Sequence, residues 1–258
     1  FKKEITQPYG MVVVSGPTGS GKSTSLYAAL KEIKSERTNI TTVEDPVEYQ
    51  LDGVNQVQVF EDIGLTFGST LRSILRQDPD VLLIGEIRDG ETADIAVKFA
   101  LTGHLVFSTV HANDAPGTIT RLLDIGIAPF LVGSCLNLVM AQRLVRRICK
   151  NCKIEYTPTN EELALVGLDS NKVSGPLYKG EGCAECRNTG YKGRLAIFEM
   201  IPMARDLRKL VFDNANEDEI RTASLNNGMT TLREAGLARV LDGTTSIQEI
   251  LRSTVEDL

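Results

Sequence analysis

The chain has 258 residues, of which 42% are apolar and 24% are charged, which suits a soluble globular protein with one large domain and a smaller one. The net charge of −6 argues against duplex DNA or an anionic membrane as the main partner, and five cysteines are too few for a disulfide scaffold. The first seven residues lack the apolar segment of a signal peptide. The most apolar run, residues 125–141, is too short and too often interrupted to span a membrane, so we expect a cytoplasmic protein without a membrane span.

The first half of the chain alternates between apolar strands and amphipathic helices. Strands are expected at residues 12–15, 39–43, 54–59, 81–84 and 105–110, and helices at 22–34, 71–77, 91–102, 116–124 and 130–147. Such alternation predicts an α/β fold with a parallel sheet and helices on both faces. In this arrangement ligands bind at the carboxyl ends of the strands.

The second half changes character after residue 148. Residues 149–195 hold four cysteines, six glycines and two prolines, with one short helical stretch at 161–166. The last sixty residues are expected to be helical, and the pairs Thr231/Glu234 and Ser246/Glu249 have the spacing of capping boxes. We therefore expect three parts: a core at 1–147, a tetracysteine segment at 148–194 and a C-terminal helical region at 195–258.

A glycine-rich stretch after the first strand fits G-x-x-x-x-G-K-[ST] from Gly16 to Ser23. Glycines allow successive backbone N–H groups to point at phosphate oxygens, and the following helix adds a positive dipole end. Lys22 would reach the β- and γ-phosphates, and the Ser23 hydroxyl would ligate Mg²⁺. The pattern predicts a nucleoside triphosphate site made by Gly16, Pro17, Thr18, Gly19, Ser20, Gly21, Lys22, Ser23 and Thr24. A site so close to residue 1 also suggests that further sequence precedes it.

Acidic residues follow two of the expected buried strands. Glu86 comes one glycine after the strand at 81–84, and Glu44 and Glu48 follow the strand at 39–43. Triphosphate hydrolysis needs a carboxylate that orients water near the γ-phosphate. Glu86 is the first candidate for this role and Glu44 the second, with Glu48 open between a functional and a surface role.

Both histidines of the chain flank one expected strand, with His104 before it and His111 after it. His111 lies at the carboxyl end of the strand, so we interpret it as a sensor of the γ-phosphate. His104 stays open between a functional and a packing role. A cation must also meet the transition state. Arg72, Arg76 and Arg88 are candidates, although a surface ion pair is the favoured interpretation of each.

Four cysteines form two C-x₂-C pairs, Cys149/Cys152 and Cys183/Cys186, with 30 residues between the pairs. Two thiolate pairs suit a tetrahedral structural Zn²⁺ site. A redox pair and unliganded thiols are the alternatives, and the setting of a thioredoxin-like redox pair is missing. Cys135 lies in an apolar stretch and is interpreted as a core residue.

Four segments together resemble the successive boxes of bacterial secretion and pilus ATPases. These are residues 16–24 (Walker A), 42–48 (Asp box), 76–89 (Walker B) and 102–111 (His box). The resemblance covers essentially the whole chain, and residues 142–147 leading into the tetracysteine segment are similar to the pilus-assembly and type II secretion members. Retraction motors of the family lack these cysteines.

The resemblance implies a RecA-like P-loop NTPase core that hydrolyses ATP with Mg²⁺, with Glu44 and Glu86 around the metal and the attacking water. It implies a homohexameric ring at the cytoplasmic face of the inner membrane that acts on a membrane platform protein. Arginines from a preceding domain would complete a neighbouring site, so this chain alone is expected to hydrolyse ATP weakly. A pilus-assembly motor is the first hypothesis. A type II secretion ATPase and a nucleotide-binding scaffold with dispensable hydrolysis are the alternatives.

Overall fold

A computed structural model describes residues 1–168 and 175–254, which divide into two compact units. The first unit comprises Phe1–Ala141 and Met200–Met229, and the second comprises Gln142–Glu199 and Thr230–Leu258. Two of the three boundaries between the units fall inside long strands, and the third lies between Met229 and Thr230 in a connection between two helices. The organisation into three parts expected from the sequence stays a prediction.

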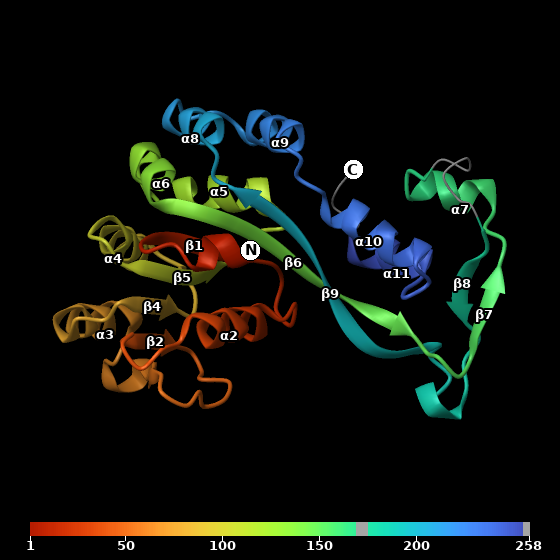
Figure 1. Ribbon diagram of the computed structural model, residues 1–258, viewed down its shortest axis with the longest axis horizontal. Coiled ribbons are helices and arrows are strands. Elements are labelled where there is room, and N and C mark those ends of the chain that lie inside the picture. Colours follow the sequence, from red (N-terminus) through yellow and green to blue (C-terminus); the bar gives the residue numbers. More distant parts are fainter. Residues whose placement is uncertain (169–174, 255–258) are drawn as a thin grey trace. The chain divides into compact units, whose positions relative to one another are not determined.

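The first unit is an α/β arrangement around a mostly parallel sheet (Figure 1). Its strands are β1 (Gly10–Ser15), β2 (Ile40–Glu44), β3 (Asn55–Gln58), β4 (Val81–Ile84) and β5 (Leu105–Val110). Its helices are α1 (Lys2–Ile5), α2 (Lys22–Ile33), α3 (Phe67–Ile74), α4 (Gly90–Leu101), α5 (Ala115–Asp124), α6 (Pro129–Cys135), α8 (Arg205–Phe212) and α9 (Glu217–Asn226). Short 3-10 turns lie at Glu61–Ile63 and Leu75–Gln77.

The order of the main sheet is β3-β2-β4-β5-β1-β6-β9, where β6 is Leu136–Ile148 and β9 is Tyr191–Pro202. Strand β1 pairs in parallel with β5 on one side and β6 on the other, and β4 joins β5 to β2 in the same direction. Every residue of β1, β2, β4 and β5 is buried. Uninterrupted apolar strands are the expected signature of a parallel sheet that is covered on both faces, and the sheet predicted from the sequence is confirmed.

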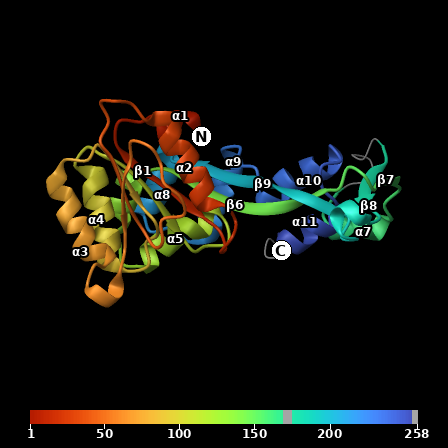
Figure 2. The same cartoon turned by 90° about the horizontal axis from the view of Figure 1, so that it is seen from below.

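Helices α2, α4 and α5 pack against β1, and the short helix α1 lies against α2 (Figure 2). The buried side chains of α2 include Leu26, Tyr27 and Leu30, which recur at helical spacing. Asp89 caps α4 by accepting a hydrogen bond from Thr92 N, and Asp114 caps α5 by accepting one from Gly117 N. These caps fix the points at which the chain leaves β4 and β5.

The expected helix at residues 130–147 is wrong beyond Cys135. Helix α6 ends there, and the chain continues as the 13-residue strand β6. Residues Leu138–Ala141 pair with Val12–Ser15 of β1, so pairing with a neighbouring strand overrides the local pattern. An apolar run in which both faces are buried does not distinguish strand from helix by periodicity, which is why the sequence misled here.

In its described residues, the second unit contains a two-stranded antiparallel sheet, the short helix α7 and two helices near the end of the chain. The strands are β7 (Lys153–Tyr156) and β8 (Leu177–Gly180), and the helices are α7 (Asn160–Leu165), α10 (Leu232–Leu241) and α11 (Ile247–Ser253), with a 3-10 turn at Ala184–Cys186. The capping box predicted at Thr231 and Glu234 is confirmed. At α11 only half of the predicted box forms: Ser246 accepts from Glu249 N, while the Glu249 carboxylate binds Arg146 and Arg252 instead.

Candidate functional site

The glycine-rich loop connects β1 to α2 in a conformation that requires glycine. The φ angles of Gly16, Gly19 and Gly21 are 142°, 76° and 87°, in the region that side chains disfavour. Gly21 is the N-cap residue directly before α2, and its left-handed backbone turns the chain into the helix. The glycines singled out from the sequence are therefore the residues that let this loop curl.

Lys22 is the first residue of α2, and its side chain folds back over the loop. Its Nζ donates hydrogen bonds to the carbonyl oxygens of Gly16, at 2.8 Å, and Pro17, at 3.1 Å. The ammonium thus lies above the loop whose N–H groups and helix end favour an anion. Ser23 follows in the first turn of the same helix.

Glu86 and His111 come together at the carboxyl ends of the neighbouring strands β4 and β5. Glu86 Oε2 lies 3.2 Å from His111 Nε2, and Glu86 Oε1 pairs with the guanidinium of Arg88. The side chain of Glu86 is 13% exposed, whereas those of Arg88 and His111 are 56% and 57% exposed. The hydrogen bond to Glu86 raises the pKa of Arg88, so this cation stays charged beside the carboxylate. The cluster joins a carboxylate, an imidazole and a guanidinium at the edge where ligands of parallel sheets bind.

Gly85 explains how the ends of β2 and β4 approach so closely. A Cβ atom at this position would lie 3.2 Å from both Glu44 Cα and the carbonyl oxygen of Val43. Gly85 N also donates to Val43 O at 2.8 Å, and Thr109 Oγ1 donates to Gly85 O at 2.7 Å. The glycine therefore brings the strand ends that carry Glu44 and Glu86 side by side.

Glu44, the second predicted carboxylate, is only 4% exposed. Its Oε1 accepts from Thr42 Oγ1 at 2.6 Å and from Gln56 Nε2 at 3.2 Å, and its Oε2 accepts from the Tyr27 hydroxyl. Burial, and then the hydrogen bond to Glu44, raise the pKa of Tyr27, so the phenol keeps its proton and donates. Glu48 lies exposed in the loop that follows β2.

Three residues considered at the sequence level lie in other settings. His104 precedes β5 at its amino end, stacks on Phe99 with ring centroids 4.0 Å apart and holds Phe99 O within 3.2 Å of Nδ1. Arg72 pairs with Glu91 of α4, and Arg76 donates to the carbonyl of Arg72. His104 thus packs on α4 and Arg72 joins α3 to α4, while the contact of Arg76 stays within its own helical segment.

Asp114 is a residue whose contacts the sequence did not reveal. Its carboxylate caps α5 and also accepts from Arg221 of α9 at 2.6 Å. Its carbonyl accepts from Thr118 Oγ1 at 2.6 Å, and the same hydroxyl lies 2.6 Å from Ser15 Oγ at the start of the glycine-rich loop. Asp114 therefore ties α5 and α9 to the strand ends. The one local indication of this cap in the sequence is the proline two residues after Asp114, because proline is favoured in the first turn of a helix.

The four predicted zinc ligands meet in the second unit. The Sγ atoms of Cys149, Cys152, Cys183 and Cys186 all lie within 4.8 Å of one another, with the pairs 149/183, 152/186 and 183/186 at 3.9, 3.8 and 3.7 Å. A tetrahedral Zn²⁺ with Zn–S bonds of about 2.3 Å requires Sγ separations of about 3.8 Å. The backbone N–H groups of Gly182 and Gly190 donate hydrogen bonds to the sulfurs of Cys152 and Cys186, respectively. Such hydrogen bonds stabilise the thiolate form that binds metal. The donor set fits this ion.

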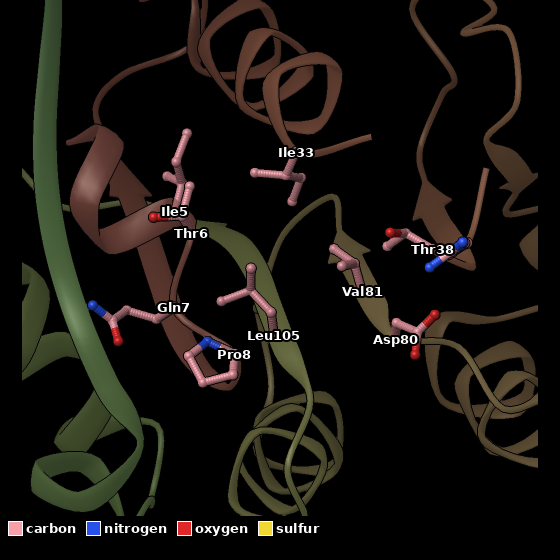
Figure 3. Close-up of a pocket in the computed structure, with 10 residues that line it drawn as sticks. Ile5, Thr6, Gln7, Pro8, Ile33, Thr38, Asp80, Val81 and Leu105 are labelled. Carbon is pink, nitrogen blue, oxygen red and sulfur yellow. The ribbon is translucent and has the colours of Figure 1, made fainter. Parts of the chain in front are cut away.

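A cavity of about 410 Å³ lies in the first unit at the amino ends of β4 and β5, away from the glycine-rich loop (Figure 3). Ile5, Pro8, Val81 and Leu105 supply apolar walls, with Asp80 at one side. Asp80 Oδ2 already accepts from Asn39 N at 2.7 Å. No predicted site residue lines this cavity, so it is separate from the candidate site.

Comparison with known proteins identifies the class. A family model described as Type II/IV secretion system protein matches residues 1–252, so the chain belongs to this family. It is 50% identical over its whole length to the type IV pilus assembly ATPase PilB of Myxococcus xanthus, covering 46% of that protein. It is 47% identical over 98% of its length to the type II secretion system protein E of Pseudomonas aeruginosa, covering 50% of that protein.

Among solved structures, the chain resembles the pilus retraction motor PilT with bound ADP. The TM-score is 0.72 at 27% identity, with 97% of this chain and 63% of that chain covered. The chain spans about half the length of the curated relatives it matches. None of the helices in residues 1–168 and 175–254 is long and apolar enough to cross a membrane.

Proposed function

We propose that this chain is the ATP-hydrolysing part of a motor that drives type IV pilus assembly. The observation that carries the proposal is the cluster of Glu86 with His111 and Arg88 at the carboxyl ends of β4 and β5, in a member of the Type II/IV secretion system protein family. Strand β5 pairs with β1, which leads into the glycine-rich loop. The similarity to a pilus assembly ATPase, at 50% identity, and to a type II secretion system protein, at 47% identity, supports the proposal.

In this proposal the first unit is a RecA-like P-loop core, and residues 16–24 hold the triphosphate. Lys22 would exchange its carbonyl acceptors for phosphate oxygens. The Ser23 hydroxyl would hold Mg²⁺, which would offset the charge of the phosphates. Glu86 accepts the proton of the attacking water or orients it. His111 stands next to Glu86 and is exposed enough to contact the terminal phosphate.

The four-thiolate cluster is proposed to hold a structural Zn²⁺ ion, which would cross-link the tetracysteine segment. Its ligands are Cys149, Cys152, Cys183 and Cys186, whose geometry supports tetrahedral coordination. No catalytic part is assigned to this ion, because all four ligands come from the protein and leave no open position.

The working assembly is proposed to be a homohexameric ring that acts on an inner-membrane platform protein from the cytoplasmic side. No direct nucleic-acid partner is assigned, in keeping with the net charge of −6. Arginines supplied from outside this chain would complete each site, since Arg72 and Arg88 pair with Glu91 and Glu86 within the chain.

The test is Glu86→Gln in the complete protein. We expect the affinity for ATP to stay within about twofold while steady-state phosphate release falls by about 10²–10⁴-fold, because the amide retains the shape but accepts no proton. Glu91→Gln is the matched control, since Glu91 is an exposed carboxylate of α4. Unchanged turnover in Glu86→Gln removes the proposed role of Glu86. A wild-type protein that binds ATP without releasing phosphate supports the scaffold alternative.

A type II secretion ATPase is the second candidate, and the 47% identity to a secretion protein E favours it specifically. The chemistry is the same and only the machine differs. Deletion of the gene separates the two: loss of surface pili with normal protein secretion supports the first candidate, and loss of secretion with normal piliation supports the second.

A further inference from the structure

The structure separates the two carboxylates that the sequence left as alternative catalytic bases. Glu86 pairs with two side chains that are more than half exposed, so its surroundings open towards a ligand. Glu44 is buried, and both of its oxygens accept hydrogen bonds from within the protein. A carboxylate that is 4% exposed and accepts three hydrogen bonds from inside the protein is poorly placed to meet a water molecule, whereas solvent reaches both partners of Glu86.

The donors to Glu44 come from three different elements. Tyr27 lies on α2, one turn after Ser23 and on the same face of the helix. Gln56 lies on β3, and Thr42 lies on β2, the strand of Glu44 itself. The Glu44 carboxylate therefore links α2 to β2 and β3, the two strands that flank the acidic loop after Glu44.

Gln56 extends this contact into the loop between β2 and β3. Its Nε2 lies within 3.3 Å of Glu44 Oε1, the Tyr27 hydroxyl and the carbonyl oxygen of Tyr49. Its Oε1 accepts from Leu51 N at 2.6 Å. The ring of Tyr49 also packs edge-on against that of Tyr27, with centroids 4.8 Å apart. One amide side chain thus fixes both ends of the segment 49–51.

We propose that buried Tyr27 and Glu44, together with part-buried Gln56, form a clamp that fixes the acidic loop at residues 45–50 relative to the phosphate-binding end of α2. Glu44 is a positioning residue in this clamp, and Glu86 is the carboxylate that meets the water. The inference rests on the proposed ATP hydrolysis. It adds Tyr27 and Gln56 to the residues that set the geometry of the site, although neither belongs to a motif.

The clamp makes a distinct kinetic prediction for Tyr27→Phe, which removes one hydroxyl from the interior. We expect kcat for ATP hydrolysis in the complete protein to fall about tenfold while KM changes less than about twofold, because the loop loses its alignment while the phosphate grip remains. Tyr49→Phe is the matched control, since it removes a hydroxyl from the neighbouring tyrosine outside the clamp, and both constants should stay within about twofold. Thr42→Val removes a donor from Glu44 without loosening α2, and its effect should be smaller than that of Tyr27→Phe.

A double-mutant cycle distinguishes positioning through Glu44 from an independent effect. Glu44→Gln should lower kcat about as much as Tyr27→Phe, and the double variant should be no slower than Glu44→Gln alone. Additive losses, or a Glu44→Gln loss as deep as that of Glu86→Gln, overturn the proposal. If Tyr27→Phe is unfolded by circular dichroism, Gln56→Met tests the same clamp from β3.

Hydrogen exchange gives a readout that needs no turnover. Loss of the Tyr27 hydroxyl should speed amide exchange at Leu51 and in residues 45–50, and Tyr49→Phe should leave it unchanged. Unchanged exchange in Tyr27→Phe overturns the clamp even if the wild-type protein hydrolyses no ATP. Failure of hydrolysis with faster exchange in Tyr27→Phe would overturn the proposed function and leave the clamp standing.

Discussion

The main sheet of the first unit and the tetracysteine segment of the second are stabilised by different means. Strands β1, β4 and β5 are buried at every position, so apolar burial holds them. In the described part of the tetracysteine segment, β7 alternates between exposed and part-buried residues, and β8 has one buried residue. This segment buries little apolar surface to offset the conformational entropy of its glycine-containing turns. The proposed coordination of a metal ion by the four thiolates would supply the missing stabilisation.

This difference separates the places where activity and stability are sensitive. Changes at the strand ends of the first unit should alter catalysis more than folding, since a packed sheet supports them. Changes in the second unit should alter folding, because its polar contacts act as structural links. Glu249 is one such link: it is fully buried and binds both Arg146 and Arg252.

The largest effect is expected on removing the metal from the four-cysteine cluster. Structural zinc in small domains contributes on the order of 10 kcal/mol of binding free energy, so chelation or Cys183→Ser should unfold the tetracysteine segment. Hydrogen exchange should become fast in residues 149–168 and 175–190 and remain slow in β1, β4 and β5. Cys135→Ala, at a buried thiol of the first unit, is the control and should keep its zinc. Metal analysis of untagged protein that finds less than about half an equivalent of zinc contradicts the site.

A smaller effect, dependent on pH, is expected for Glu249→Gln. Burial acts to raise the pKa of Glu249, but hydrogen bonds from Arg252 and Arg146 outweigh it and lower the pKa below the ordinary value of 4.5. The carboxylate therefore stabilises the fold fully above about pH 4.5, and this contribution is lost as the pH falls through the lowered pKa. Glu249→Gln should cost on the order of 2–3 kcal/mol at pH 7 and less in acid.

Urea unfolding monitored in the second unit at pH 7 and pH 3 measures this difference. Glu36→Gln, at an exposed carboxylate, serves as the control and should change the free energy of unfolding by less than about 0.5 kcal/mol. An equal loss at both pH values would show that shape, rather than charge, explains the role of Glu249.

The smallest effect on stability is expected for Gly85→Ala in the first unit. Its methyl group would press on the backbone of Val43 and Glu44 at 3.2 Å, which should cost about 1–2 kcal/mol. Phosphate release should fall more than this cost suggests, because Glu44 and Glu86 move apart. Gly175→Ala has open space around its Cβ and is the control for thermal unfolding and turnover. A full wild-type rate in Gly85→Ala would show that the close approach of the strands does not serve catalysis.

Local patterns predicted most of the first unit, because buried parallel strands and amphipathic helices leave clear periodicities. Val81–Ile84 and Leu105–Val110 form the strands expected from their apolar runs. Strand β6 was not predicted, because its pairing with β1 joins residues more than 120 positions apart and no local pattern indicates such a pairing. Tertiary pairing decides such ambiguous apolar runs.

The candidate site shows the same division between local and distant information. The φ angles of Gly16, Gly19 and Gly21 follow from a contiguous motif, and the sequence predicted them as loop residues. The clamp of Tyr27, Glu44 and Gln56 draws on one helix and two strands, and no spacing rule connects these residues. The direction of the expected strand already separated His111, at the carboxyl end where ligands bind, from His104 at the amino end. The stacking of His104 on Phe99 is a contact that no local pattern announced.

The two hydrogen bonds that hold Lys22 over its own loop also set a threshold for ligand choice. A ligand must compete with the carbonyl groups of Gly16 and Pro17 for the Lys22 ammonium. The ammonium therefore contributes to affinity only the difference between its bonds to the ligand and its bonds to these carbonyl groups. A lone inorganic anion offers too few additional contacts to win this exchange by a wide margin. In the proposed triphosphate site, a ligand that contacts several loop N–H groups at once would meet this threshold more readily than a ligand that contacts few of them.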